Sequence, residues 1–150
     1  MTELRAHGLA VTLHRGWEAR ILMPKEPPPA DNHPVVRLAN FAMPPTRDTY
    51  AEDAAEELAA GQVLASVVEF SPRLADRGLY AEQGVPRFTR DDLDPRALQR
   101  HLPGRFGLQR FFSMHGRPFS LYVIAREGDG LDASIRDLEA QLHTMVVEAR

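Results

Sequence analysis

Three carboxylates within four residues, Asp91, Asp92 and Asp94, form the densest cluster of reactive side chains in the sequence. Carboxylate oxygens bind divalent cations, so the cluster has the composition of a cation site. The ligand order and central glycine of an EF-hand loop are missing, however, and Asp94 directly precedes Pro95, which is typical of a helix N-cap followed by proline at the first helical position. We therefore interpret Asp94 as a cap and the other two aspartates as solvated loop residues.

No other local pattern in the sequence predicts catalysis. Ser113 and His115 stand two residues apart in an expected turn, where a productive nucleophile–base geometry would be accidental. The six histidines include no pair with the i, i+4 spacing of a helical metal site, and the chain has no cysteine. P-loop, dinucleotide-binding and GxSxG motifs are also missing. From the sequence we expect a protein that is not an enzyme, with no metal and no cofactor.

Arginine dominates the segment 95–126, which contains no acidic residue. The guanidinium fork suits carboxylate recognition, so the segment predicts a binding surface for a protein partner, with an acidic protein as one candidate. An alternative is that these arginines pair with the acidic stretch 48–57 of the same chain. Interleaved phenylalanines also give the segment the composition of a nucleic-acid surface, but the net charge of -3 argues against that reading. The candidate partner-binding residues are Arg96, Arg100, Arg105, Arg110 and Arg117.

Length and composition indicate one globular domain covering residues 1–150. The chain is 26% charged and 43% hydrophobic, which is too apolar for a disordered chain. No apolar run approaches the roughly 20 residues that cross a bilayer, and the first residues lack the basic start and apolar core of a secretory signal. These features predict a cytoplasmic protein with no membrane contact.

Alternating hydrophobicity predicts a mainly antiparallel β-sheet built from hairpins. Residues 9–13 and 17–23 alternate with period two around Arg15-Gly16, which predicts a hairpin. A proline-rich stretch at 24–34 is expected to be an exposed loop. Further strands are expected at 35–41, 63–70, 106–113 and 118–125, the last two forming a second hairpin.

Two main helices, at about 50–60 and 134–146, are expected to flank this sheet in an α+β fold. Thr49 and Glu52 have the spacing of a capping box before the first helix, and Gly61 stands where a C-cap glycine belongs. The second helix carries an apolar stripe that is typical of core packing: Ile135, Leu138, Leu142, Met145 and Val146.

Several short motifs resemble a known superfamily. Gly16-Trp17 before a strand, a helix and strand at 50–70, the stretch 116–123 (GRPFSLYV) and a closing amphipathic helix resemble the PsbP-like α/β/α sandwich. The stretch Leu108 to Phe112 is also similar to small uncharacterised actinobacterial proteins. This resemblance implies a non-enzymatic binding module, because most members of that superfamily bind proteins.

The sequence thus favours a bacterial protein-binding module, such as an adaptor, an effector or secretion chaperone or an assembly component. Exposed strand edges also suggest a homodimer. The alternative is a small-molecule-binding protein or enzyme with a pocket between sheet and helices, because sites built from distant residues leave no local motif. Nucleic-acid binding through 95–126 is the weaker alternative.

Overall fold

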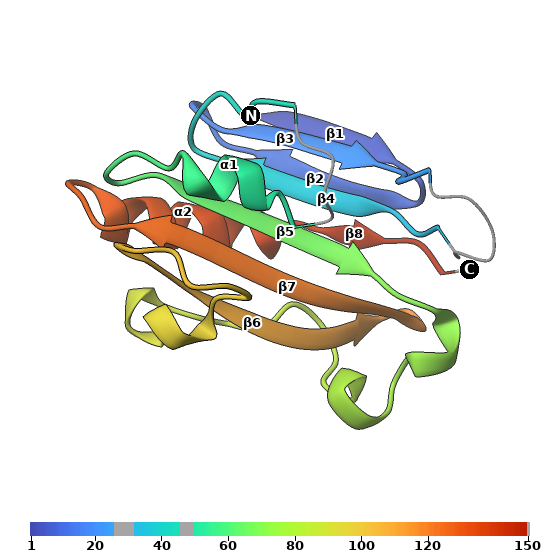
Figure 1. The fold of residues 1–150 in the computed structure, drawn as a ribbon. Helices are drawn as coiled ribbons and strands as arrows, with labels where there is room; N and C mark the ends of the chain where they lie inside the picture. Colours follow the sequence, from blue (N-terminus) through green and yellow to red (C-terminus); the bar gives the residue numbers. More distant parts are fainter. Residues whose placement is uncertain (26–31, 46–49, 150) are drawn as a thin grey trace.

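The computed structural model describes residues 1–25, 32–45 and 50–149, which form two antiparallel sheets (Figure 1). The smaller sheet has the order β1-β2-β8 and the larger one has the order β3-β4-β5-β7-β6. The strands are β1 (Thr2–Ala6), β2 (Leu9–Leu13), β3 (Glu18–Leu22), β4 (Val35–Ala39), β5 (Val63–Glu69), β6 (Arg105–Met114), β7 (Arg117–Arg126) and β8 (Val146–Val147). The expected α+β fold, made mainly of antiparallel sheet, is confirmed.

The hairpin expected at 106–113 and 118–125 is the longest ladder of the molecule. β6 and β7 are paired over their full length, from Arg105 opposite Arg126 to Met114 opposite Arg117. His115 and Gly116 both have positive φ, as a type I′ turn requires. The tight glycine-bearing connection therefore decides the pairing locally.

The hairpin expected between 9–13 and 17–23 is wrong, although both strands exist. β2 pairs with β1 and β8, whereas β3 pairs with β4 in the other sheet. The turn at Arg15-Gly16 thus carries the chain from one sheet to the other. The true partner of β2 is joined to it by His7-Gly8, whose φ values of 53° and 77° again fit a two-residue turn.

The two helices are shorter than the sequence indicates. α1 comprises only Glu52–Glu56, and α2 comprises Leu131–Leu142. Ile135, Leu138 and Leu142 of the predicted stripe are buried as expected, but the helix ends before Met145. The chain then turns into β8, where Val147 rather than Val146 is buried.

The segment between β5 and β6 contains four short 3-10 helices in place of regular structure. They are η1 (Pro72–Leu74), η2 (Gly78–Tyr80), η3 (Arg90–Asp92) and η4 (Pro95–Ala97). Asp94 caps η4, because its carboxylate accepts the Arg96 N–H at 2.8 Å. This confirms the expected cap, but the helix that it begins is a single turn.

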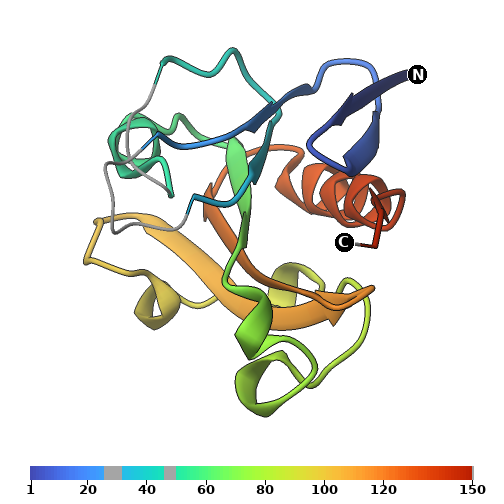
Figure 2. The ribbon, with the colours of Figure 1, turned by 90° about the vertical axis from the view of Figure 1, so that its right-hand side faces the viewer.

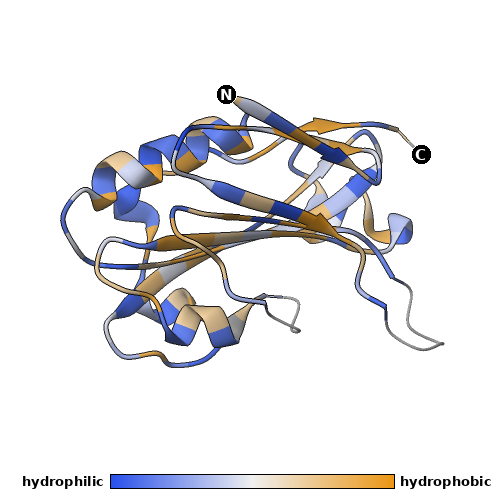
Figure 3. Ribbon diagram, turned by 90° about the horizontal axis from the view of Figure 1, so that it is seen from above, coloured by the Kyte–Doolittle hydropathy of each residue, from blue (hydrophilic) through white to orange (hydrophobic). Residues whose placement is uncertain are grey.

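The larger sheet separates two layers of packing (Figure 2). On one face, α2 and the smaller sheet bury an apolar cluster that includes Val11, Leu108 and Leu138. On the other face, α1 packs with Leu58 on Leu64 and Ile124. Figure 3 shows the hydrophobic residues concentrated in the central strands, while α2 is hydrophobic on one side and hydrophilic on the other.

Two sequence predictions fall largely outside the described residues. Residues 26–31 of the expected proline-rich loop at 24–34 are not described; of the flanking positions, Lys25 and Asn32 are exposed and Pro34 is buried. Thr49 of the expected capping box also lies outside them. Within the described ranges, no helix has the length and apolarity needed to cross a bilayer.

Candidate functional site

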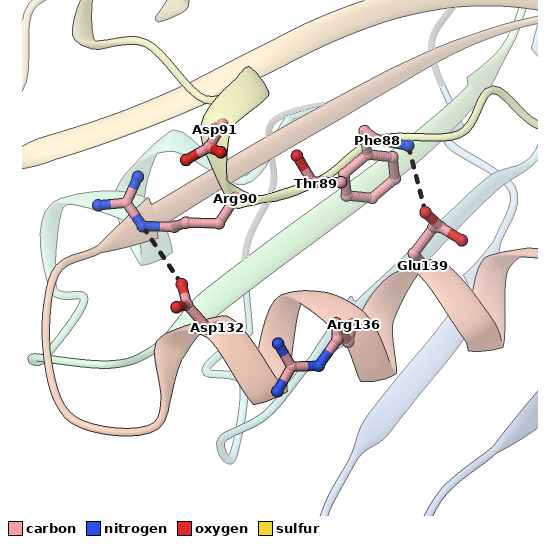
Figure 4. A pocket seen from close by; sticks show the side chains of 7 residues that line it. All are labelled: Phe88, Thr89, Arg90, Asp91, Asp132, Arg136 and Glu139. Atoms are coloured by element: carbon pink, nitrogen blue, oxygen red, sulfur yellow. Dashed lines mark hydrogen bonds and ion pairs between the residues drawn. The ribbon is translucent and has the colours of Figure 1, made fainter.

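A groove of about 560 Å³ lies between α2 and the loop that contains η3 (Figure 4). The loop contributes Phe88, Thr89, Arg90 and Asp91, and successive turns of α2 contribute Asp132, Arg136 and Glu139. The α2 residues share one face because their spacing is three to four residues. The groove is therefore built from two segments about 40 residues apart in the sequence.

Arg90 forms one wall of this groove and is held on three sides. Its guanidinium lies 4.2 Å from the centre of the Phe106 ring, a cation–π contact. It also forms an ion pair with Glu127, and its Nε lies 3.9 Å from an Asp132 carboxylate oxygen. These contacts fix Arg90 in place and leave it little freedom to reorient toward a ligand.

Glu139 ties the loop to α2 at the other end of the groove. One carboxylate oxygen accepts a bond from Arg87 at 3.2 Å, and the other accepts the Phe88 N–H at 3.3 Å. The Phe88 side chain is buried in the core. The loop is thus anchored to the helix by an apolar contact and a shared carboxylate.

Two charged side chains of the groove, Arg136 and Asp91, take no part in these contacts. The Arg136 side chain leaves α2 between Asp132 and Glu139 and runs along the helix, with its guanidinium turned away from residues 88–91 in this view (Figure 4). Arg136 is exposed and forms no ion pair or hydrogen bond with any residue that the structure describes. An exposed guanidinium has five donors in a fork that fits a carboxylate. The Arg136 guanidinium is therefore available to an external anion, in a groove that the carboxylates of Asp91, Asp132 and Glu139 also line.

A second, more apolar hollow of about 370 Å³ adjoins the groove on the far side of Arg90. Its apolar lining comes from Leu93, Pro95, Leu102 and Phe106, and its rim includes His101 and Arg105. Arg90 lines both hollows. Through Arg90 they form one cleft, with a groove of mixed charge at one end and an apolar hollow at the other.

Three of the arginines in 95–126 are directed at α1 of the same chain. Arg105 donates to the carbonyl oxygens of Ala55, Glu56 and Leu58, and Arg126 donates to Leu58 at 3.0 Å. Arg100 forms an ion pair with Glu56. Cations at the C-terminal end of a helix compensate its unpaired carbonyls, so these side chains hold α1 against the sheet.

Arg117 is a buried residue of the interior, not a surface residue. Its guanidinium binds both carboxylate oxygens of Glu69, at 2.6 and 3.1 Å. It also donates to the backbone carbonyls of His7, Gly8 and Glu148, so that it joins the larger sheet to the smaller one. A residue in this position does not reach an external partner.

The remaining two candidate arginines are accessible but lie apart from the groove. Arg96 is exposed and binds its neighbour Asp94, with 3.2 Å between the closest charged atoms. Arg110 is partly exposed, 3.9 Å from Asp92, on the strand face that it shares with buried Leu108 and Phe112. Of the five predicted residues, only Arg105 lines either hollow. A partner-binding role of Arg96 and Arg110 stays a prediction.

Asp92 and Asp94 of the carboxylate cluster, and Ser113 of the Ser113–His115 pair, have structural contacts in the fold. Asp92 accepts the Thr89 N–H at 2.7 Å, which completes a capping box around η3. The Ser113 hydroxyl donates to the Tyr80 carbonyl at 2.7 Å and accepts the Asp76 N–H. Among the described residues, no group of three or more acidic or histidine side chains is arranged to hold a metal ion.

A row of polar residues crosses all five strands on the α1 face of the larger sheet. Directly opposite one another in register are Arg20, Arg37, Ser66, Tyr122 and Gln109. The middle three are at most 2% exposed. Tyr122 accepts the Gln99 N–H at 2.9 Å, whereas the buried Ser66 hydroxyl has no hydrogen-bond partner in the described part of the chain. Burial of a polar group without a partner is costly, so Ser66 marks a position with unused bonding capacity.

Sequence reasoning missed Arg90, Arg136 and the polar row. Each depends on which segments meet in space. Arg90 and Arg136 come together where a loop meets a helix, and the polar row forms where five strands lie in register. Strand alternation would have placed Ser66 among apolar neighbours, but not beside Arg37.

Comparisons of the chain with protein-family models, curated proteins and solved structures give no match.

Proposed function

We propose that the protein is a binding module for a protein partner, and that an extended segment of the partner lies in the cleft between α2 and residues 88–93. The observation that carries this proposal is the position of Arg136, an exposed guanidinium on a groove that shares Arg90 with an apolar hollow. An acidic residue of such a segment would pair with Arg136, and a bulky apolar residue would fill the hollow.

This proposal keeps the acidic partner expected from the sequence but moves the site. Arg100, Arg105 and Arg117 use their donors inside the fold, so they offer little to a ligand. The same engagement argues against nucleic-acid binding through 95–126, because phosphate contacts need accessible cations. The function is non-enzymatic in this proposal, in line with the PsbP-like resemblance, and we place it in the bacterial cytoplasm, because the first residues lack the pattern of a secretory signal.

The test uses a random peptide library displayed on phage and selected against the wild-type protein. We expect enriched peptides to carry an acidic residue and a large apolar residue a few positions apart. Their affinities are then measured by fluorescence polarisation for wild type, Arg136→Glu, Arg96→Glu and the matched exposed control Arg15→Glu. Arg136→Glu should weaken binding at least tenfold, and the other two variants should bind within twofold of wild type.

Two results of this experiment would contradict the proposed site. Equal affinity of Arg136→Glu and wild type would show that the peptides do not bind in the groove. A loss of affinity confined to Arg96→Glu would show that the peptides bind to the arginine-rich segment 95–126. Titration with single- and double-stranded oligonucleotides at low and physiological salt tests the nucleic-acid alternative, which predicts salt-sensitive binding.

A second candidate function is the binding of a small polar molecule at the row around Ser66. The unpartnered Ser66 hydroxyl favours it, because a ligand that supplied a hydrogen bond there would recover the cost of burial. A thermal-shift screen of metabolites tests this function, since ligands that bind the native state raise its melting temperature. A shift that persists in Ser66→Ala would count against the row as the site.

A further inference from the structure

Strand β1 forms the edge of the smaller sheet and lies at the outer rim of the molecule (Figures 1 and 2). Among the described strands, it forms a ladder with β2 alone. An edge strand presents backbone N–H and C=O groups that can pair with another chain. The groups that β1 presents can be identified from its hairpin.

The register of the β1–β2 hairpin determines which residues of β1 point outward. Ala6 and Leu9 flank the two-residue turn, so they form a hydrogen-bonded pair, and such pairs alternate along an antiparallel ladder. Leu4 and Ala6 therefore bond to β2. The N–H and C=O groups of Glu3 and Arg5 point away from β2, toward the outer edge.

These same two residues carry opposite charges. The side chains of Glu3 and Arg5 are about half exposed and lie on one face, where they form an ion pair at 3.1 Å. Leu4 points to the other face and packs against the core. A charged edge repels a second copy when like charges meet, but opposite charges two residues apart attract when two such strands run antiparallel.

We propose that β1 pairs with β1 of a second copy about a twofold axis, with Leu4 opposite Leu4. In this register Glu3 of each copy lies opposite Arg5 of the other. The four outward backbone groups of each strand then form two reciprocal hydrogen-bonded pairs, and the two three-stranded sheets join into one of six strands. This surface is separate from the cleft of the proposed function.

The two edges of the larger sheet are β3 and β6, and both differ from β1. On β3 the charged side chains Glu18 and Arg20 are already bound to the Met43 backbone, and β6 is covered by loop segments, so β1 is the edge that we assign. Along β6, Gly107 exchanges both backbone hydrogen bonds with Asp94, at 2.8 and 3.1 Å. Near its other end, the Ser113 N–H donates to Glu82 and its carbonyl accepts the Gly84 N–H, each at 2.8 Å. Loop segments thus occupy β6 at both ends, as expected for a blocked edge.

The test is a charge-swap series on the tag-free protein, measured by sedimentation velocity over a wide concentration range. The wild type should show a concentration-dependent dimer. Glu3→Arg puts arginines opposite each other, and Arg5→Glu puts glutamates opposite each other. Each single change should weaken the dimer at least tenfold, and the double variant Glu3→Arg/Arg5→Glu should return to within about threefold of wild type.

A control separates this effect from contacts within one chain, because Arg5 also lies 3.3 Å from Glu148. Glu148→Gln removes that contact and should leave the dimer unchanged. Circular dichroism and urea unfolding should show that all variants are folded. A wild type that remains monomeric at every concentration would overturn the proposal. A double variant no better than the single variants would overturn the register.

Discussion

Arg117 and Glu69 form an ion pair in the interior, with side chains 3% and 0% exposed. Arg117 lies on β7 and Glu69 on β5. The Arg117 guanidinium also donates hydrogen bonds to the backbone carbonyls of His7 and Glu148. A residue expected to bind a partner is thus the link between the two sheets. Removal of either side chain should therefore lower the stability of the fold strongly.

Breaking this pair should destabilise the fold severely. Arg117→Met or Glu69→Gln leaves one buried group without its partner, which costs about 3–5 kcal/mol of unfolding free energy. Urea unfolding followed by circular dichroism measures the loss. The double variant should lose less than the sum of the two single losses, because neither charge remains unpaired. Losses below about 1 kcal/mol would show that the pair is solvated in solution.

Arg105 should be needed to hold α1, whereas Arg96 should not. Arg105→Met removes the donors that three carbonyls at the end of α1 accept, and we expect a loss of about 1–3 kcal/mol. Arg96→Met is the matched control, since this side chain is 91% exposed and changes at such sites stay within about 0.5 kcal/mol. Chemical denaturation of both variants checks the difference. Equal stabilities would contradict the assigned role.

Gly107 should tolerate no side chain. A Cβ at this position would lie 2.1 Å from the Val123 carbonyl oxygen of the neighbouring strand. Because backbone cannot move aside cheaply, Gly107→Ala should cost about 3 kcal/mol or more. Gly116→Ala is the control: its Cβ meets nothing within 4 Å, and only its φ of +75° is unfavourable, at about 1–2 kcal/mol. Thermal unfolding that ranks the two variants in the opposite order would refute this packing.

The cap at Asp94 should make stability depend on acid pH. Hydrogen bonds from the side chain and backbone of Arg96 lower the pKa of Asp94 below the ordinary value of 3.8 for an aspartate. A carboxyl whose pKa is lower in the folded state stabilises the fold above the unfolded value, and this contribution is lost as pH falls through the folded value. Asp94→Asn keeps an acceptor oxygen without the charge. Urea unfolding should find wild type more stable than Asp94→Asn at pH 7, with the difference vanishing below the folded pKa.

Ser66 should be a site where removing a hydroxyl does no harm. A buried hydroxyl without a partner costs free energy in the folded state, so Ser66→Ala should keep or raise stability, by up to about 1 kcal/mol. Ser120, which is also buried, is the control because its hydroxyl accepts a bond from Gln109 at 3.1 Å. Ser120→Ala should therefore lose stability. A clear loss for Ser66→Ala in differential scanning calorimetry would show that the hydroxyl is bonded.

The sequence by itself determined the elements whose signals are local. The strands at 35–39 and 63–69 follow from apolar runs, and the β6–β7 hairpin follows from its two-residue turn. Asp94 before Pro95 was sufficient to locate a cap. Each of these features depends on neighbours within a few residues, so a single chain segment carries the necessary information.

Only the tertiary structure decided which strands pair and which charges are free. Alternation in 9–13 and 17–23 predicts two strands, but an alternating strand can pair with any other, and here each joined a different sheet. In the same way, the sequence by itself does not distinguish the arginine at 117 from the arginine at 136. Burial beside Glu69 makes the first a structural link, and exposure beside a groove leaves the second available, because partners and burial are set by segments far apart in the chain.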